Sequence, residues 1–285
     1  MIVINYVYIL DSMSKLPKFK FHLAGKLVPA LVVVIVLMAF ALGAMWGKLQ
    51  GASGPAPAAG TTTQTTQAAP AAPVQPKVAL ADIKSLFNGN YIQFGDANRK
   101  LLFVEVADPS CPYCHVAGGL NPQLNAQVGS QFKLVSDGGS YIAPVVEMHK
   151  LVDAGKASFV WIYSPGHGNG EMGTKALYCA ADLGKFWEVH DKLMTSAGYD
   201  LLNTKVLNDK TKSGEIASFL AGAVDTAKLK SCLDSGKYDQ RLSSDQAQAA
   251  KLGVNGTPGF FINETNFAGA YSWKDMQPVA DAALK

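Results

Sequence analysis

The sequence predicts an α/β domain with an inserted helical subdomain, preceded by one transmembrane helix and a disordered linker. Three observations predict this arrangement. Residues 27–47 form an uncharged run of 21 residues, which is long enough to cross a bilayer as a helix. Residues 48–77 are rich in Ala, Pro, Thr and Gln. From residue 78 onward, β-type runs lie near both ends of the remaining chain, and apolar residues with helical spacing fill its middle.

The charges around the apolar run predict its orientation. Four lysines precede the run and one follows it directly (Lys15, Lys18, Lys20 and Lys26 against Lys48). This excess places residues 1–26 in the cytoplasm and the rest of the chain outside. A cleaved signal peptide is the alternative, but the run is longer than the usual apolar region of such a peptide. We therefore expect a single-pass signal-anchor in the lipid bilayer of the cell membrane, for which Met13 would be a more conventional start than Met1.

The linker and the charge balance exclude other classes of function. Residues 51–76 contain five prolines and no charge, so they cannot bury enough apolar surface to fold. The first 77 residues hold six lysines and one acid, whereas residues 78–285 hold 19 basic and 21 acidic side chains. The predicted domain therefore has no excess of basic charge for a nucleic acid.

The predicted domain at 78–285 begins and ends with recognisable elements. Strands are expected at 100–107, 158–164 and 259–262, where β-branched and aromatic residues gather. Helices are expected at 79–86, 174–194, 214–220, 225–252 and 273–284 from the spacing of their apolar residues. The helical insertion accordingly spans about 166–250.

The pair Cys111 and Cys114 directly follows the first strand, in the sequence Cys-Pro-Tyr-Cys. A strand-to-helix transition places the first sulfur at a helix N-terminus, where free N–H groups favour thiolate over thiol. Pro112 suits the first helical turn because its missing N–H costs nothing there. We predict Cys111 as the exposed attacking sulfur and Cys114 as the buried resolving sulfur of one redox-active disulfide.

Other readings of this motif are possible. A zinc site would need two more ligands at metal spacing, and Cys179 and Cys232 are isolated, so no metal is expected. A purely structural disulfide would stabilise the domain little, because it would close a loop with only two residues between the cysteines. Together with His115 the motif also matches the attachment pattern of a c-type haem electron carrier, although it follows a buried strand. A redox-inert binding module would carry the motif without cycling it. We expect no cofactor beyond the disulfide itself.

The motif resembles the active site of the DsbA-like branch of the thioredoxin superfamily. Residues 252–262 are similar to that family's G-V-x-G-T-P-x-F-x-I signature, and residues 176–191 to the segment that opens its helical insertion. The resemblance covers roughly 95–285 and implies a thioredoxin fold and a protein thiol–disulfide oxidoreductase. It also implies a cis Thr257–Pro258 bond beside the first cysteine, with Pro112, Tyr113, Thr257 and Pro258 contacting substrate.

The resemblance and the sequence patterns assign three further residues. Glu105 stands in an apolar strand, where burial would raise its pKa. It resembles the family's buried acid that manages the proton of the second cysteine, although simple alternation would instead place it on a solvent face. Cys179 and Cys232 each lie on an apolar helix face. Buried free cysteines are common, but in an oxidising compartment such a pair usually forms a structural disulfide, which we expect here.

We predict the direction of electron flow from the places where this sequence departs from the family pattern. Tyr113 stands where the best-known oxidase has a thiolate-stabilising histidine, and the stretch 121–156 has no obvious counterpart. An isomerase of this family would need a dimerisation domain where this chain has the linker and 78–90. We therefore expect a monomeric oxidase that acts on unfolded or cysteine-containing exported proteins and is recycled by a quinone-linked membrane thiol oxidase, or alternatively by a reductase. Reductase or isomerase activity on the same fold is the alternative.

Overall fold

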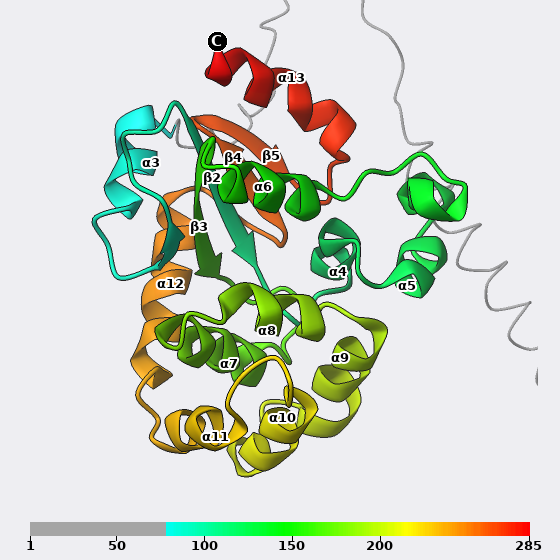
Figure 1. Cartoon of the computed structure of the whole chain (residues 1–285), viewed down its shortest axis with the longest axis vertical. Helices are drawn as coiled ribbons and strands as arrows, with labels where there is room; N and C mark the ends of the chain where they lie inside the picture. The colour runs from blue at the N-terminus through cyan, green and yellow to red at the C-terminus, as the bar shows by residue number, and fades with distance from the viewer. Residues whose placement is uncertain (1–77) are drawn as a thin grey trace, which may run out of the picture. The chain divides into compact units, whose positions relative to one another are not determined.

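The computed structural model describes residues 78–285. The predicted cytoplasmic segment 1–26, the membrane span 27–47 and the linker 48–77 lie outside the described residues. Within 78–285, none of the helices combines the length and the apolar character that crossing a bilayer requires. The described part is a mixed α/β domain, as predicted, with one five-stranded sheet and helices on both of its faces (Figure 1).

The sheet has the strand order β1-β3-β2-β4-β5. Its strands are β1 (Ile92–Phe94), β2 (Leu101–Ala107), β3 (Ala157–Tyr163), β4 (Gly259–Ile262) and β5 (Thr265–Ala268). β2 pairs parallel with β3 and antiparallel with β4, and the two outer strands pair antiparallel with their neighbours. Because β2 and β3 are parallel, the segments that follow them emerge at the same edge of the sheet.

Both faces of the sheet are covered, so every residue of β2 and β3 is buried, and all of these residues except Glu105 and Ser158 are apolar. Phe103 and Trp161 belong to the larger core, which includes residues of α6 (Pro144–Asp153), α7 (Glu171–Asp182) and α13 (Trp273–Leu284). Val104 belongs to a smaller core on the other face, built with α3 (Leu80–Leu86) and α12 (Asp239–Lys251).

The helical insertion lies between β3 and β4. Its helices run from Glu171 to Lys251, close to the range of 166–250 that the sequence predicts. Two stretches predicted as continuous helices are each broken in two. Gly184 separates α7 from α8 (Phe186–Leu193), and Gly236 separates α11 (Thr226–Asp234) from α12. Both glycines have positive φ, at 66° and 65°, a conformation that other residues rarely adopt.

The remaining helical elements complete the described chain. They are α4 (Pro112–Gly118), α5 (Pro122–Gln127), η2 (Ser130–Phe132), η3 (Val135–Asp137), α9 (Ser196–Asp200), η4 (Leu201–Val206), η5 (Lys210–Lys212) and α10 (Ser213–Phe219). The stretch 121–156, which has no obvious counterpart in the family pattern, contains α5, η2, η3 and α6. Leu134 and Tyr141 from this stretch pack on Val116 of α4 in a small core of their own.

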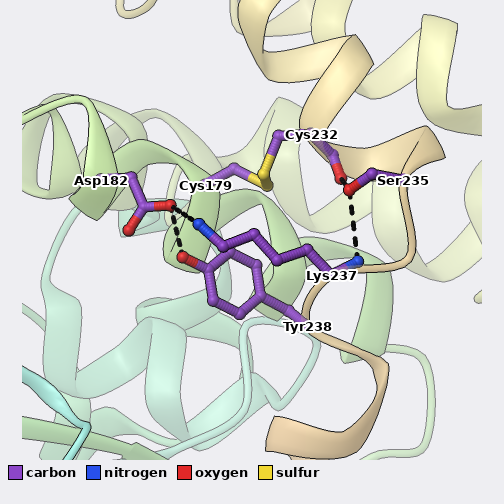
Figure 2. Close-up of a disulfide and its surroundings, with 6 residues drawn as sticks. All are labelled: Cys179, Asp182, Cys232, Ser235, Lys237 and Tyr238. Atoms are coloured by element: carbon purple, nitrogen blue, oxygen red, sulfur yellow. Dashed lines mark hydrogen bonds and ion pairs between the residues drawn. A yellow bond between two sulfur atoms is a disulfide. The ribbon is translucent and has the colours of Figure 1, made fainter.

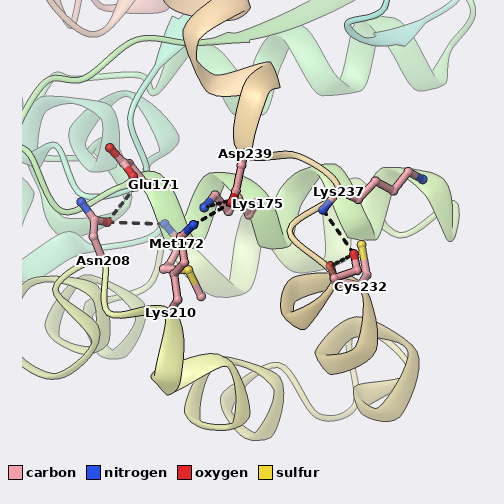
Figure 3. A network of polar contacts seen from close by, with 9 residues as sticks. Glu171, Met172, Lys175, Asn208, Lys210, Cys232, Lys237 and Asp239 are labelled. Carbon is pink, nitrogen blue, oxygen red and sulfur yellow. Dashed lines mark hydrogen bonds and ion pairs between the residues drawn. The ribbon is translucent and has the colours of Figure 1, made fainter.

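Polar contacts, some of them buried, fix the insertion to the sheet and order its helices. The Asp245 carboxylate of α12 accepts a hydrogen bond from the Tyr163 backbone N–H at 3.0 Å and another from the Tyr178 hydroxyl at 2.6 Å. Figure 3 shows a second network, in which Asp239 receives ion pairs from Lys175 at 2.5 Å and Lys210 at 2.6 Å. These contacts join β3, α7 and α12, so the insertion is held against the end of the sheet that carries the cysteine motif.

A disulfide joins Cys179 of α7 to Cys232 of α11, across a sequence separation of 53 residues. Figure 2 shows it beside Asp182, which accepts hydrogen bonds from Lys237 and from the Tyr238 hydroxyl. The bond therefore closes a loop that contains α8, α9 and α10.

Removing this disulfide should destabilise the protein without touching its redox motif. A loop of this length should contribute about 4 kcal/mol to the free energy of unfolding in the chain-entropy model. We expect a loss of that size for Cys179→Ala/Cys232→Ala in a Cys111→Ser/Cys114→Ser background, measured by urea unfolding. If the midpoint and slope of the urea transition do not change, the prediction is wrong, and other contacts already restrain the unfolded chain of the variant.

Candidate active site

Cys111 lies at the N-terminus of α4, directly after the turn that follows β2. It is the N-cap residue of this helix, and Pro112 occupies the first helical turn. The backbone N–H groups of Cys114 and His115 both donate to the Cys111 carbonyl oxygen, at 3.1 and 3.2 Å. The strand-to-helix geometry expected from the sequence is therefore present. Cys111 is less exposed than expected, however, at 4% of its surface, because the loop after β3 packs over it.

The two cysteines are both free thiols and are electrostatically unequal. The pKa of Cys111 is lowered to about 6, first because of a hydrogen bond with the Cys114 thiol and then because of Thr257 and the backbone N–H groups of Cys114 and Tyr113. Burial raises the pKa of Cys114 well above its usual range, and the negative charge of Cys111 raises it further. At neutral pH the first sulfur is a thiolate and the second a thiol.

The loop that contains Thr257 and Pro258 lies directly against Cys111. The bond between these two residues is cis, and Cys111 Sγ lies 3.4 Å from the Thr257 carbonyl oxygen, which accepts a hydrogen bond from the thiol when Cys111 is protonated. A cavity of about 290 Å³ borders this loop and is lined by Val254, Thr257 and Pro258, among others. Pro258 is buried, Pro112 is half-buried, and Tyr113 is 43% exposed. The structure thus brings together all of the residues that the sequence assigned to the motif and to substrate contact.

Asp108 organises the site and was not singled out from the sequence. Its side chain is completely buried, and one carboxylate oxygen accepts hydrogen bonds from the N–H and the hydroxyl of Ser110, both at 2.7 Å. The other oxygen accepts from the N–H groups of Gly166 at 2.7 Å and His167 at 3.0 Å. One carboxylate therefore ties the turn before Cys111 to the loop after β3. An Asp after a strand is a weak signal, because its partners lie 58 and 59 residues away.

The loop held by Asp108 approaches Cys111 so closely that it needs a glycine. A Cβ atom on Gly166 would lie 3.1 Å from the Cys111 Cβ and 1.8 Å from the Thr257 hydroxyl oxygen. Any side chain at this position would separate the loop from the nucleophile or from the Thr257–Pro258 loop. The sequence-based interpretation treated Gly166 only as the start of the helical insertion.

Glu105 lies within β2, opposite Trp161 of β3 and Phe260 of β4. Its side chain is 1% exposed, so it does not face solvent. Burial raises its pKa to about 7, and the opposing influence is the charge of His190. The charge of Glu105 in turn contributes to the raised pKa of Cys114. A carboxyl group that titrates near neutrality beside a buried thiol can take up or supply the proton of that thiol.

His115 occupies a position that does not fit a haem ligand. Its ring is fully buried, and both nitrogens already face carbonyl oxygens, Nδ1 that of Met194 at 2.9 Å and Nε2 that of Pro109 at 2.8 Å. An axial iron ligand requires a free ring nitrogen. The Cys111–His115 segment therefore does not fit the haem group that its pattern also matches. Instead, His115 connects the turn before Cys111 to the end of α8.

The charge state of Cys111 predicts how the reduced protein reacts with alkylating reagents. Since the pKa of Cys111 is about 6, its modification by iodoacetamide should follow a single titration near pH 6. The rate should fall below that pH, as the thiolate takes up a proton, and stay constant above it. Cys114 should remain unmodified in the native protein. Mass spectrometry of peptides after brief exposure at each pH measures both effects, and a midpoint near the ordinary thiol value of about 8.5 would contradict them.

Comparisons with known proteins agree with this fold. A family model described as Thioredoxin matches residues 147–282. Oxidised BdbD from Bacillus subtilis is 18% identical, covers 68% of this chain and 92% of its own, and superposes with a TM-score of 0.51. A variant of α-DsbA1 from Wolbachia pipientis is also 18% identical, with 73% and 96% covered and a TM-score of 0.53. At these identities the likeness establishes a thioredoxin-like fold.

The curated relatives are longer proteins. The chain is 25% identical over 194 residues to the Na⁺/H⁺ antiporter NhaA 3 of Salinispora tropica, and 24% identical over 191 residues to the antiporter NhaA of Herminiimonas arsenicoxydans. Each match covers 67% of this chain but only 24% and 25% of the relative, so the chain spans about a quarter of their length.

The thioredoxin-like fold and the Cys111–Cys114 site together support a thiol–disulfide oxidoreductase.

Proposed function

We propose that this thiol–disulfide oxidoreductase works outside the cytoplasm as an oxidase that transfers its Cys111–Cys114 disulfide to exported proteins. The observation that carries the proposal is the stabilised Cys111 thiolate, whose pKa is lowered to about 6. A dithiol whose attacking sulfur is stabilised as a thiolate favours the reduced form, so its disulfide is a stronger oxidant. The Cys179–Cys232 disulfide supports an oxidising compartment, because such bonds rarely persist in the cytosol.

The transfer takes place in two exchange steps. A substrate thiolate attacks Cys111 Sγ, so the Cys111–Cys114 bond breaks, a mixed disulfide forms, and Cys114 leaves as a thiolate that takes up a proton. A second substrate thiolate then attacks the substrate sulfur of the mixed disulfide. The substrate disulfide forms, Cys111 leaves as a thiolate, and two electrons remain on the dithiol. The proposed membrane partner, a quinone-linked thiol oxidase, would accept these electrons and restore the disulfide.

The location and assembly of the protein are part of the same proposal. The apolar run at 27–47 would anchor the chain, with 48–77 as a linker between the bilayer and the catalytic domain. The substrates would be unfolded or cysteine-containing exported proteins, which would meet a monomeric domain tethered to the membrane. The half-exposed Tyr113 and the buried Pro258 would border the bound substrate beside Cys111.

The equilibrium of the Cys111–Cys114 pair with glutathione tests the direction of transfer. We expect a reduction potential between about −120 and −180 mV, the range of known oxidants and isomerases. A value near about −270 mV, like that of thioredoxin, would instead favour a reductase. That alternative has one structural argument, since Tyr113 packs edge-on against Phe132 and brings no positive charge to the thiolate. The Cys179→Ala/Cys232→Ala variant is the control. It keeps only Cys111 and Cys114, the two cysteines of the Cys-Pro-Tyr-Cys (CPYC) motif, so a potential measured on it belongs to that pair.

A further inference from the structure

Residues 164–170 connect β3 to α7 and form a covering loop over Cys111. A Cβ atom on Gly166 would lie 3.1 Å from the Cys111 Cβ, and only 4% of the Cys111 surface is exposed. The Thr257 carbonyl oxygen lies 3.4 Å from Cys111 Sγ, so a second loop borders the same sulfur. The rate of disulfide exchange depends on access to the sulfur that is attacked. The position of the covering loop therefore bears on which thiols can reach Cys111.

The covering loop is rich in glycine and is nevertheless fixed at several points. Three of its seven residues are glycines, and Gly168 has a φ of 93°. Because glycine is conformationally permissive, this sequence alone does not fix the loop. The Asp108 carboxylate accepts hydrogen bonds from two backbone N–H groups of the loop, at 2.7 and 3.0 Å, and the Ser110 hydroxyl oxygen accepts one from the Asn169 N–H at 3.2 Å. These bonds hold the loop to the turn before Cys111.

The helical insertion holds the same loop from the other direction, through two asparagines. Asn208 Nδ2 donates to the Gly168 carbonyl oxygen at 2.7 Å. Asn203 Oδ1 accepts a hydrogen bond from Asn169 Nδ2 at 3.1 Å, and Asn203 Nδ2 donates to the Ser110 carbonyl oxygen at 3.1 Å. Both asparagines therefore join the insertion to the covering loop, and Asn203 also reaches the residue directly before the nucleophile.

Asn208 lies in a backbone conformation that is unusual outside glycine. η4 is a π-helical turn, and the two residues that follow it, Leu207 and Asn208, have φ values of 47° and 64°. Such turns and such left-handed residues are both rare, and both occur often at functional sites. Asn208 Oδ1 also accepts hydrogen bonds from the N–H groups of Glu171 and Met172, at 2.9 and 3.4 Å (Figure 3). One amide therefore joins the start of α7 to the covering loop.

We propose that Asn203 and Asn208 are specificity-determining residues, which hold the covering loop on Cys111 and so admit thiols on narrow, flexible chains while they exclude thiols on folded surfaces. The inference rests on the proposed exchange, in which a substrate thiolate bonds to Cys111 Sγ, the Cys111–Cys114 bond breaks and the electron pair stays on Cys114. A cysteine in an extended segment brings little more than its own side chain and the adjoining peptide units to the site. A cysteine on a folded surface brings its surroundings with it, and these collide with the covering loop.

Asn208→Asp releases the covering loop while it preserves the start of α7. The aspartate keeps an acceptor for the N–H groups of Glu171 and Met172, but it has no donor for the Gly168 carbonyl oxygen. Aspartate also tolerates a left-handed conformation better than most residues do. Amide hydrogen exchange of residues 166–169 measures the release, and these amides should exchange at least about tenfold faster than in the native protein.

Two thiol probes of matched pKa then measure access to Cys111 in the full chain with the Cys111–Cys114 disulfide formed. One is a flexible Gly/Ser-rich peptide with a single cysteine, and the other is a small folded helical bundle with a single cysteine on an exposed helix. In the native protein the peptide should open the disulfide at least about tenfold faster than the bundle, as measured by quenching and mass spectrometry. Asn208→Asp should reduce this ratio to about threefold or less, because the rate with the bundle rises. Asn203→Ala should act in the same direction, and it provides the same test if Asn208→Asp does not fold.

Asn98→Asp is the matched control, because it adds the same charge at an exposed position in the turn before β2. It should leave both rates unchanged. The inference is wrong if Asn208→Asp frees the loop amides without changing the ratio, or if the amides stay protected. Equal rates of the two probes with the native protein also overturn it, while the proposed function stands. If neither probe opens Cys111–Cys114 in the native protein, the proposed function fails as well.

Discussion

Replacing Cys111 with serine is expected to abolish disulfide exchange, whereas replacing Cys114 with serine should trap mixed disulfides with substrates. Cys111 is the sulfur with the lowered pKa, about 6, and it lies against the Thr257–Pro258 loop. Cys114 is 1% exposed and its pKa is raised, so it serves only as the leaving or resolving group. Without Cys114 an intermediate on Cys111 cannot be resolved within the protein and must wait for an external thiol.

Non-reducing electrophoresis followed by mass spectrometry of the trapped species measures both effects. The activity of Cys111→Ser should fall to the level without protein. Cys179→Ala/Cys232→Ala is the control, and it should retain exchange because that disulfide lies in the helical insertion, between α7 and α11. Mixed disulfides formed through Cys114 in Cys111→Ser would reverse the roles assigned to the two sulfurs.

Local sequence signals were sufficient for the parts of the site that depend on neighbouring residues. The apolar run of β2 and the proline after Cys111 predict a strand followed by a helix, and the structure contains both. The paired cysteines and the Thr-Pro dipeptide were recognisable because a few adjacent residue types define each of them. The strand-to-helix transition also contributes to the thiolate at Cys111, through the backbone N–H groups of Cys114 and Tyr113.

Features that depend on distant partners could not be predicted in this way. β5 is an edge strand with exposed residues and no alternating pattern, so only its pairing with β4 reveals it. The breaks at Gly184 and Gly236 interrupt stretches whose apolar spacing continues across them. Cys111 was expected to be exposed, but Gly166 from a loop more than 50 residues away covers it. The contacts of Asp108 belong to the same group, since two of its partners lie in that loop.

Replacing Asp108 with asparagine should have two effects. It should lower the free energy of unfolding, and it should change the pKa of Cys111. The carboxylate accepts four hydrogen bonds, from two groups of Ser110 and from the N–H groups of Gly166 and His167. An amide would present its own N–H₂ group to two of these donors, inside a site that water does not reach. We expect a loss of about 3–5 kcal/mol in the free energy of unfolding, as for the removal of one partner from a buried charged network.

The effect on Cys111 distinguishes Asp108 from an ordinary buried residue. If the carboxylate fixes the loop after β3 against the CPYC turn, its loss should let Gly166 move away from Cys111. The alkylation midpoint of Cys111 should then fall below about 6, because burial raises the pKa of this thiol and the loop contributes to its burial. Ser110→Ala, which removes one of the four donors, should cost only about 1 kcal/mol. Asp182→Asn, the matched change at a half-exposed ion pair, should cost no more than about 1 kcal/mol and leave the midpoint unchanged. A strongly destabilised Asp108→Asn protein whose Cys111 still titrates near pH 6 would show that the turn alone, without the loop, sets the thiolate.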